Sequence, residues 1–114
     1  MPDPITIREA GGTWVVRAGG AVLGETTRAL ALDEDGHDTV IYFPRDDIAT
    51  AFLDRSDKRT HCPKKGDATY WSIITKSTTI ENAAWSYEDP IEQAQAIAGH
   101  LAFHTSDLLA VEKI

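Results

Sequence analysis

The chain has 114 residues, of which 42% are hydrophobic and 25% charged, a balance typical of one globular domain. Its formal net charge of −7 argues against duplex nucleic acid or an anionic membrane as the main partner, because both bind basic surfaces. One cysteine cannot form an internal disulfide, and no apolar run suits a membrane span or a secretory leader. We therefore expect a single cytoplasmic domain over residues 1–114 that folds without a cofactor.

The first part of the chain has the pattern of several short strands. Ile5–Arg8 alternates in polarity, and Thr13–Thr26 reads as two strands joined by a turn at Gly19-Gly20. The Arg28–Asp33 segment also alternates, but its six residues fit either a strand or a helical turn. After an Asp-Gly turn, the β-rich run Val40–Pro44 predicts another strand, which its proline closes.

The middle of the chain predicts one short helix followed by strands. Asp46 or Asp47 is suited to cap a helix near 47–53. The charged stretch that follows has the character of a turn or loop. Strand patterns resume at Ala68–Thr75 and Thr78–Tyr87, with a bend between them.

The clearest local signal predicts a helix near residues 90–98. Asp89 is suited to the N-cap and Pro90 to the first helical position. Gly99 is a natural C-terminal stop, because glycine readily adopts the left-handed conformation found there. Two further strand patterns, at 101–104 and 108–114, then read as a final hairpin. About eight short strands with one good helix predict a mainly β domain.

Positive charge is concentrated in one segment of this acidic chain. Positions 55–65 hold five of the eleven basic residues, opposed there only by Asp57. This run fits either a solvated loop or a local attraction for a small anion. The Cys62–Gly66 turn adds a rigid proline, two lysines and a glycine that exposes backbone N–H groups. Arg45, just after the Val40–Pro44 strand, offers a planar fork for the same anion.

Cys62 also raises two chemical alternatives, a metal site and a nucleophile. With one cysteine and four histidines in no paired spacing, the chain lacks the ligand pattern of structural zinc, and we expect no metal. His61, Lys64 and Lys65 could activate the thiol, but no acid that orients the histidine is identifiable. The favoured interpretation of Cys62 is a small, half-buried hydrophobic residue at a strand entry.

Three segments together resemble the bacterial domain of unknown function family 427. They are YFPRDDI at 42–48, THCPKKGDATYWSI at 60–73 and ENAAWSYEDPIEQAQAIAGHLAFH at 81–104. The resemblance implies a β-tent, in which two antiparallel sheets meet at a steep angle with little helix. Relatives elsewhere in that fold join their sheets with a four-cysteine zinc site, which this chain lacks. His104 stands where the family motif has a tyrosine.

A nucleotidyltransferase-like label is attached to this family, and the resemblance alone does not support that activity. Nucleotidyl transfer normally needs carboxylates that hold Mg²⁺ near a triphosphate. Asp46 and Asp47 are adjacent, so on a strand their carboxylates point to opposite faces. The resemblance therefore predicts a fold and a set of candidate residues without a reaction.

Our leading hypothesis is a domain that binds a small anionic or polar molecule in a pocket between two β-sheets. The predicted ligand-binding residues are Tyr42, Arg45, Cys62, Lys65, Gly66, Trp71 and Trp85, of which the aromatic ones offer flat faces for a ring. One alternative is an enzyme that uses Cys62 as a nucleophile or redox thiol, with His61 or His104 as the base. Another is a protein-interaction module that docks through its strand edges. The sequence is also compatible with a homodimer.

Overall fold

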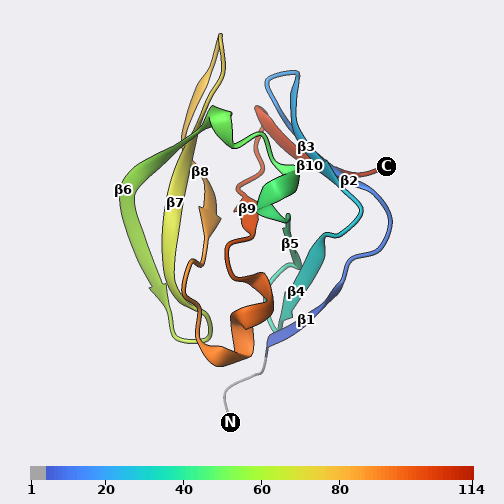
Figure 1. Ribbon diagram of the computed structural model, residues 1–114, viewed down its shortest axis with the longest axis vertical. Coiled ribbons are helices and arrows are strands. Elements are labelled where there is room, and N and C mark those ends of the chain that lie inside the picture. Colours follow the sequence, from blue (N-terminus) through green and yellow to red (C-terminus); the bar gives the residue numbers. More distant parts are fainter. Residues whose placement is uncertain (1–4) are drawn as a thin grey trace.

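Antiparallel strands dominate the computed structural model, which describes residues 5–114 (Figure 1). The strands are β1 (Ile5–Glu9), β2 (Trp14–Ala18), β3 (Ala21–Thr26), β4 (Leu30–Glu34), β5 (Val40–Tyr42), β6 (Leu53–Cys62), β7 (Gly66–Ile74), β8 (Thr79–Ser86), β9 (Leu101–Phe103) and β10 (Leu109–Lys113). They pair as three sheets, in the orders β1-β4-β5, β10-β2-β3 and β6-β7-β8-β9. The predicted mainly β fold is confirmed, with three hydrogen-bonded sheets in place of the two expected.

The sheets face one another across the molecule, with β6, β7 and β8 on one side and β1, β4 and the β10-β2-β3 sheet on the other (Figure 1). A short bridge joins the first and third sheets at their inner edges. The N–H of Phe43 donates to the carbonyl of Leu101 at 2.8 Å, and the reverse bond measures 2.9 Å. This bridge places the segment that follows β5 directly beside β9.

Two predicted hairpins form as expected. Gly19 and Gly20 join β2 to β3 with φ angles of 54° and 90°, the left-handed conformation that a tight two-residue hairpin turn requires. The β7 and β8 strands pair across the predicted bend. In β3, Gly24 approaches the chain near Ile48 so closely that a Cβ would lie 2.5 Å from the Ile48 Cδ1 atom. The glycine therefore lets the segment after β5 pack against the second sheet.

The helical segments are all short 3₁₀ turns in the described part of the chain: η1 (Arg45–Asp47), η2 (Thr50–Phe52) and η3 (Glu92–Ile97). The η3 helix lies where a helix near 90–98 was predicted, and Gly99 follows it with φ of 71°. The predicted cap at Asp89 is wrong, since the N-cap is Ile91. The Ile91 N–H donates to the Lys65 carbonyl at 2.9 Å, which holds this segment extended against the β6–β7 turn.

Three other predictions about local structure are wrong. In place of one helix near 47–53 the chain forms the separate turns η1 and η2, whose N-caps are Pro44 and Ala49, so neither Asp46 nor Asp47 is a cap. The expected final hairpin does not form, because β9 pairs with β8 while β10 pairs with β2 in a different sheet. The basic run at 55–65 belongs largely to β6, an edge strand with a register shift between Arg55 and Arg59. An edge strand tolerates consecutive charges because one side of it faces solvent.

The core consists of two buried hydrophobic clusters. One lies around Phe43, Ile73 and Leu101, and the other around Tyr42, Tyr87 and their neighbours. Within residues 5–114, no helix combines the length and the apolar character that crossing a membrane would need. The inner faces of the three sheets thus supply the buried surface on which the segments bearing the candidate site are fixed.

Candidate ligand-binding cleft

A cleft of about 470 Å³ lies between the η1–η2 segment and the β6-β7-β8-β9 sheet. Its lining combines charged and apolar side chains: Arg45, Asp46, Ile48, Thr50, Leu53, Trp71 and Leu101. We call it the Arg45 cleft. Its volume lies within the range of pockets that bind small molecules.

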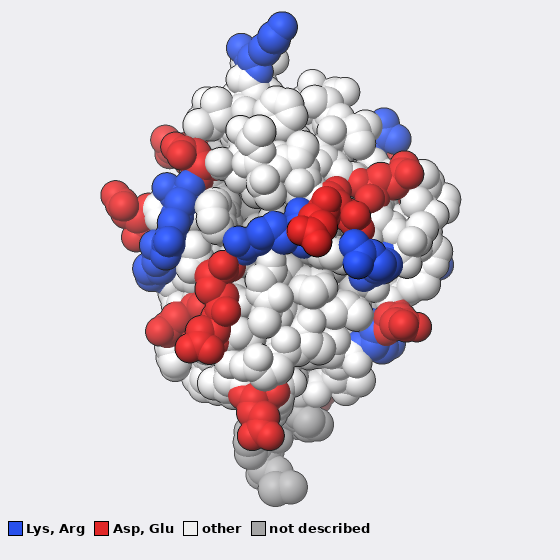
Figure 2. Space-filling view, in the orientation of Figure 1, with Lys and Arg blue, Asp and Glu red and all other residues white. Residues whose placement is uncertain are grey.

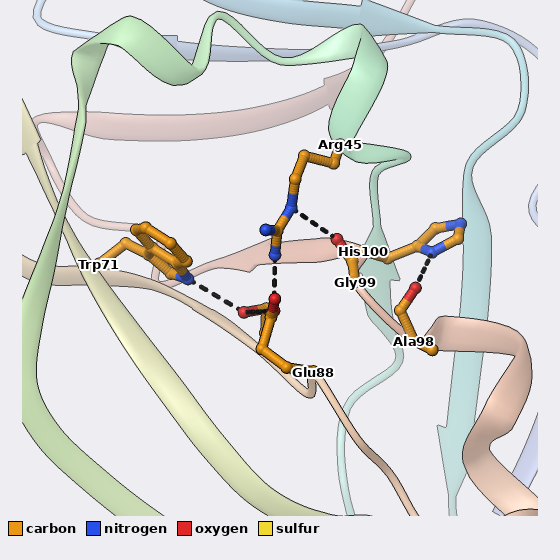
Figure 3. Close-up of polar contacts among 7 residues, drawn as sticks. Arg45, Trp71, Glu88, Ala98, Gly99 and His100 are labelled. Atoms are coloured by element: carbon orange, nitrogen blue, oxygen red, sulfur yellow. Dashed lines mark hydrogen bonds and ion pairs between the residues drawn. The ribbon is translucent and has the colours of Figure 1, made fainter.

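Arg45 is held in place by three contacts (Figure 3). Its Nε donates to the Gly99 carbonyl at 3.0 Å, and its Nη2 donates to Glu88 Oε2 at 2.6 Å. The guanidinium carbon also lies 5.4 Å from the ring centroid of Trp71, within the range of a cation–π interaction. A guanidinium has five N–H donors, so these two hydrogen bonds leave three for other acceptors.

Glu88 connects Arg45 to the aromatic wall of the cleft. The Trp71 Nε1 donates to Ser86 Oγ at 3.0 Å, and Ser86 Oγ donates to Glu88 Oε2 at 2.5 Å (Figure 3). Burial alone would raise the pKa of Glu88. The hydrogen bonds from Ser86 and Arg45, with the charges of Arg45 and Arg55, outweigh burial and hold that pKa below its ordinary value. Glu88 is therefore ionised at neutral pH and fixes the orientation of Arg45.

A second hollow of about 460 Å³ adjoins Arg45 and Asp46 on the side of η3. Arg28 and His100 also line it. The Nδ1 of His100 lies 3.2 Å from the Ala98 carbonyl, and a carbonyl only accepts, so this nitrogen carries the proton (Figure 3). Arg45 therefore stands between two hollows, with Trp71 toward one and His100 toward the other.

The charges on this face are interleaved rather than separated. Figure 2 shows acidic and basic side chains alternating across the middle of the molecule, with large uncharged areas above and below this band and further charges toward the top and bottom edges. Arg28, for example, pairs with Asp47 at 3.1 Å. A ligand would thus meet individual donors here instead of a broad positive field.

Lys65 and Gly66, two of the predicted ligand residues, lie in a different cluster from Arg45. The Nζ of Lys65 is 3.6 Å from Glu34 Oε1, and the Nζ of Lys64 is 3.2 Å from Glu34 Oε2. Lys65 also lies over the Tyr87 ring, 5.8 Å from its centroid. Gly66 is buried with φ of 117°, and a Cβ there would come within 3.4 Å of the Pro90 Cα atom. This turn is packed against the segment before η3.

Cys62 and the histidines considered with it do not form a group. Cys62 is half-buried against the cluster that contains Tyr42. Its strand neighbour His61 is exposed and lies 2.7 Å from Asp67 Oδ1 through Nδ1. His104 instead packs on Trp85, with ring centroids 4.4 Å apart. Among residues 5–114, no three Cys, His, Asp or Glu side chains are grouped to hold a metal ion.

Tyr42 lies in the interior, whereas Trp85 is half-buried at the edge of the same cluster. Tyr42 is fully buried, and its hydroxyl accepts a hydrogen bond of 3.2 Å from Trp85 Nε1. Burial raises the pKa of Tyr42 to about 12, so the phenol stays neutral. Of the seven predicted residues, only Arg45 and Trp71 line the Arg45 cleft together.

Sequence reasoning did not identify Glu88 and Gly99 as partners of Arg45, nor Ser86 as the residue that links Glu88 to Trp71. A signal for two of them was present in Trp85-Ser86-Tyr87-Glu88, where Ser86 and Glu88 alternate with aromatic residues. The carbonyl of Gly99 carried no such signal, because its position depends on the bond from the Gly99 N–H to the Tyr87 carbonyl at 3.0 Å. The contact between Arg45 and the Gly99 carbonyl joins segments far apart in the chain, so only the fold determines it.

The fold and the Arg45 cleft together define a small mainly β domain with a charged and partly apolar cleft at the side of one sheet. The chain belongs to the family described as Domain of unknown function (DUF427), whose sequence model matches residues 6–113. A search among curated proteins finds no match.

Proposed function

We propose that the protein binds a small anionic or polar molecule in the Arg45 cleft. The observation that carries this proposal is the fixed guanidinium of Arg45, which keeps three N–H donors beside an apolar wall. In this arrangement a carboxylate or similar group accepts hydrogen bonds from Arg45, and Leu53, Leu101 and Trp71 contact the apolar part of the ligand.

The local charge favours a ligand with one negative charge over a polyphosphate. Glu88 already accepts from Arg45, and Asp46 adds a second carboxylate to the lining. Arg55 supplies further positive charge near Glu88. Two arginines against two acids leave little net charge, so geometry rather than charge excess would select the ligand.

A thermal-shift screen of monocarboxylates, sugar phosphates and nucleotides tests this proposal. A ligand at about 100 times its dissociation constant stabilises the native state by about 2.7 kcal/mol, which raises the melting temperature by several degrees. We expect a monocarboxylate to give that rise in the wild type and not in Arg45→Gln. Arg17→Gln is the matched control, because Arg17 is exposed and, within residues 5–114, pairs only with Glu112 at 3.8 Å.

A second variant separates loss of binding from loss of folding. Thr50 is exposed on η2 and lines the cleft, so Thr50→Trp should obstruct the cleft without touching Arg45. Binding lost in Arg45→Gln and Thr50→Trp and kept in Arg17→Gln supports the proposal. Equal shifts in all four proteins, or no shift with any compound, contradict it.

The two alternative functions stay predictions without a supporting contact. Asp67 orients His61, the base proposed for Cys62, but His61 and Cys62 are neighbours in β6, so their side chains point to opposite faces of the strand. For an interaction module, β6 offers ten residues of edge strand. Arg59 Nη1 donates to the carbonyls of Ser56 and Lys58 at 2.8 and 2.6 Å, which reduces the acceptors open to an added strand.

A further inference from the structure

A separate pocket of about 430 Å³ opens where strands of all three sheets meet. Its wall is largely apolar and aromatic, with Trp14 from β2, Trp85 from β8, Phe103 from β9 and Val111 from β10. We call it the three-sheet pocket. It shares no lining residue with the Arg45 cleft.

The space in this pocket follows from a small residue in a central strand. Ala31 lies in β4, directly between Arg8 of β1 and Ile41 of β5 in the pairing register. Residues opposite one another in antiparallel strands share a face, so these three side chains point the same way. Ala31 is only 1% exposed and lines the pocket. A larger side chain at this position would fill the space.

The rim of the pocket carries an oriented cation. Arg8 Nε donates to Asp33 Oδ2 at 2.8 Å, and Thr39 Oγ1 donates to Asp33 Oδ1 at 2.5 Å. These two bonds hold the pKa of Asp33 below its ordinary value, so Asp33 stays ionised. Arg8 and Thr39 line the pocket, whereas Asp33 does not. Within residues 5–114, the Arg8 side chain donates one hydrogen bond, from Nε. Four of its five N–H donors therefore remain for a ligand.

We propose that the three-sheet pocket binds an aromatic carboxylic acid. Its ring lies among Trp14, Trp85 and Phe103, and its carboxylate accepts hydrogen bonds from Arg8. Aromatic rings stack favourably on such side chains, and guanidinium matches carboxylate in planar geometry. The pocket volume is suited to a small ligand. This site differs from the Arg45 cleft, so either proposal can fail without the other.

The three tryptophans allow the two sites to be distinguished in one experiment. Each indole N–H has its own acceptor: Gly11 for Trp14, Ser86 for Trp71 and Tyr42 for Trp85. We therefore expect three resolved indole signals in a ¹H–¹⁵N spectrum, assigned by Trp→Phe variants. Titration with 2-naphthoate should shift the Trp14 and Trp85 signals saturably, whether or not Trp71 also shifts through binding in the Arg45 cleft. The neutral 2-naphthamide should bind at least tenfold more weakly.

Two variants test separately the contacts to the aromatic ring of the ligand and the contact of its carboxylate with Arg8. Ala31→Leu should abolish binding of 2-naphthoate while the rest of the spectrum stays folded. Arg8→Gln should weaken 2-naphthoate at least tenfold and make it equal to 2-naphthamide, and the control Arg17→Gln should leave both affinities unchanged. If Ala31→Leu fails to fold, Arg8→Gln still decides. The proposal is overturned by no saturable shift at millimolar 2-naphthoate, by a shift of Trp71 alone, or by equal affinity for acid and amide in the wild type.

Discussion

Two clusters in this molecule pair a glutamate with basic side chains, but one is largely covered and the other is partly exposed. Around Glu34, the side chains of Glu34 and Lys65 are each 13% exposed and that of Lys64 is 24% exposed. Around Glu88, the exposed fractions are 41% for Glu88 and 35% for Arg45. The first cluster is covered by the β6–β7 turn and Tyr87, whereas the second lies beside an open cleft.

The difference shows why positive charge alone did not locate the site. The basic run predicted from the sequence includes Lys64 and Lys65, but both ammonium groups lie against Glu34. Their role is to join the end of β4 to the β6–β7 turn. Arg45 is a single cation outside that run, and it keeps unused donors in the Arg45 cleft. Accessible donors, rather than the local sum of charge, identify the candidate site.

The largest effect is expected from removing the covered carboxylate. Glu34→Gln leaves two largely covered lysines without a counter-charge, which should lower the free energy of unfolding by about 2 kcal/mol. Chemical denaturation at pH 7 measures this change. The matched control is Glu112→Gln, where an exposed pair at 3.8 Å should contribute less than about 0.5 kcal/mol. Equal losses in the two variants would show that the Glu34 cluster is no more stabilising than a surface pair.

Glu88→Gln should lower stability less than Glu34→Gln does, and it should strengthen ligand binding in the Arg45 cleft. The partly exposed carboxylate should contribute about 1 kcal/mol through its bonds with Arg45 and Ser86, after allowance for solvent. Its loss removes a competing anion, so a monocarboxylate that binds in the Arg45 cleft should bind more tightly. Calorimetric titration of wild type, Glu88→Gln and Glu34→Gln measures this, with Glu34→Gln keeping the wild-type affinity. Weaker binding by Glu88→Gln would mean that orienting Arg45 matters more than relieving competition.

The same variant has a defined signature in acid. The native pKa of Glu88 lies below its ordinary value of 4.5, so its stabilisation is complete above pH 4.5. That contribution is lost as the pH falls through the lower native pKa. Glu88→Gln should therefore lose less stability than the wild type between pH 4.5 and more acidic conditions.

Much of the fold was predictable because its signals are local. Strand alternation, the Gly19-Gly20 turn and the Gly99 stop each act within a few residues, and all three appear where expected. Pairing partners were not predictable in the same way. Leu101–Phe103 and Leu109–Lys113 look like a hairpin, but each finds a better-matched strand in a different sheet.

Part of the candidate site was predictable from local features of the sequence, and the part that depends on long-range contacts was not. Arg45 and Trp71 were identified by residue type and strand position, and the structure brings both to the Arg45 cleft. The expected link to Lys65 was not formed, because Glu34, which lies far away in the sequence, already occupies that ammonium group. Long-range pairing decides which charges stay available, and a single sequence carries no local mark of it.

The smallest effect is expected at His104, where the related family motif has tyrosine. Burial against Trp85 and the nearby charge of Lys58 lower the pKa of His104 below 6.5. The native state therefore disfavours the protonated ring, and stability should fall as the pH drops through the ordinary histidine range.

His104→Tyr keeps an aromatic ring on Trp85 and removes this titration. Its melting temperature should thus fall less between pH 7.5 and 5.5 than that of the wild type, by one or two degrees at most. Arg17→Gln, which changes an exposed side chain in a different sheet, is the control and should keep the wild-type difference. An unchanged pH dependence in His104→Tyr would show that the imidazole is protonated as readily in the folded protein as in the unfolded chain.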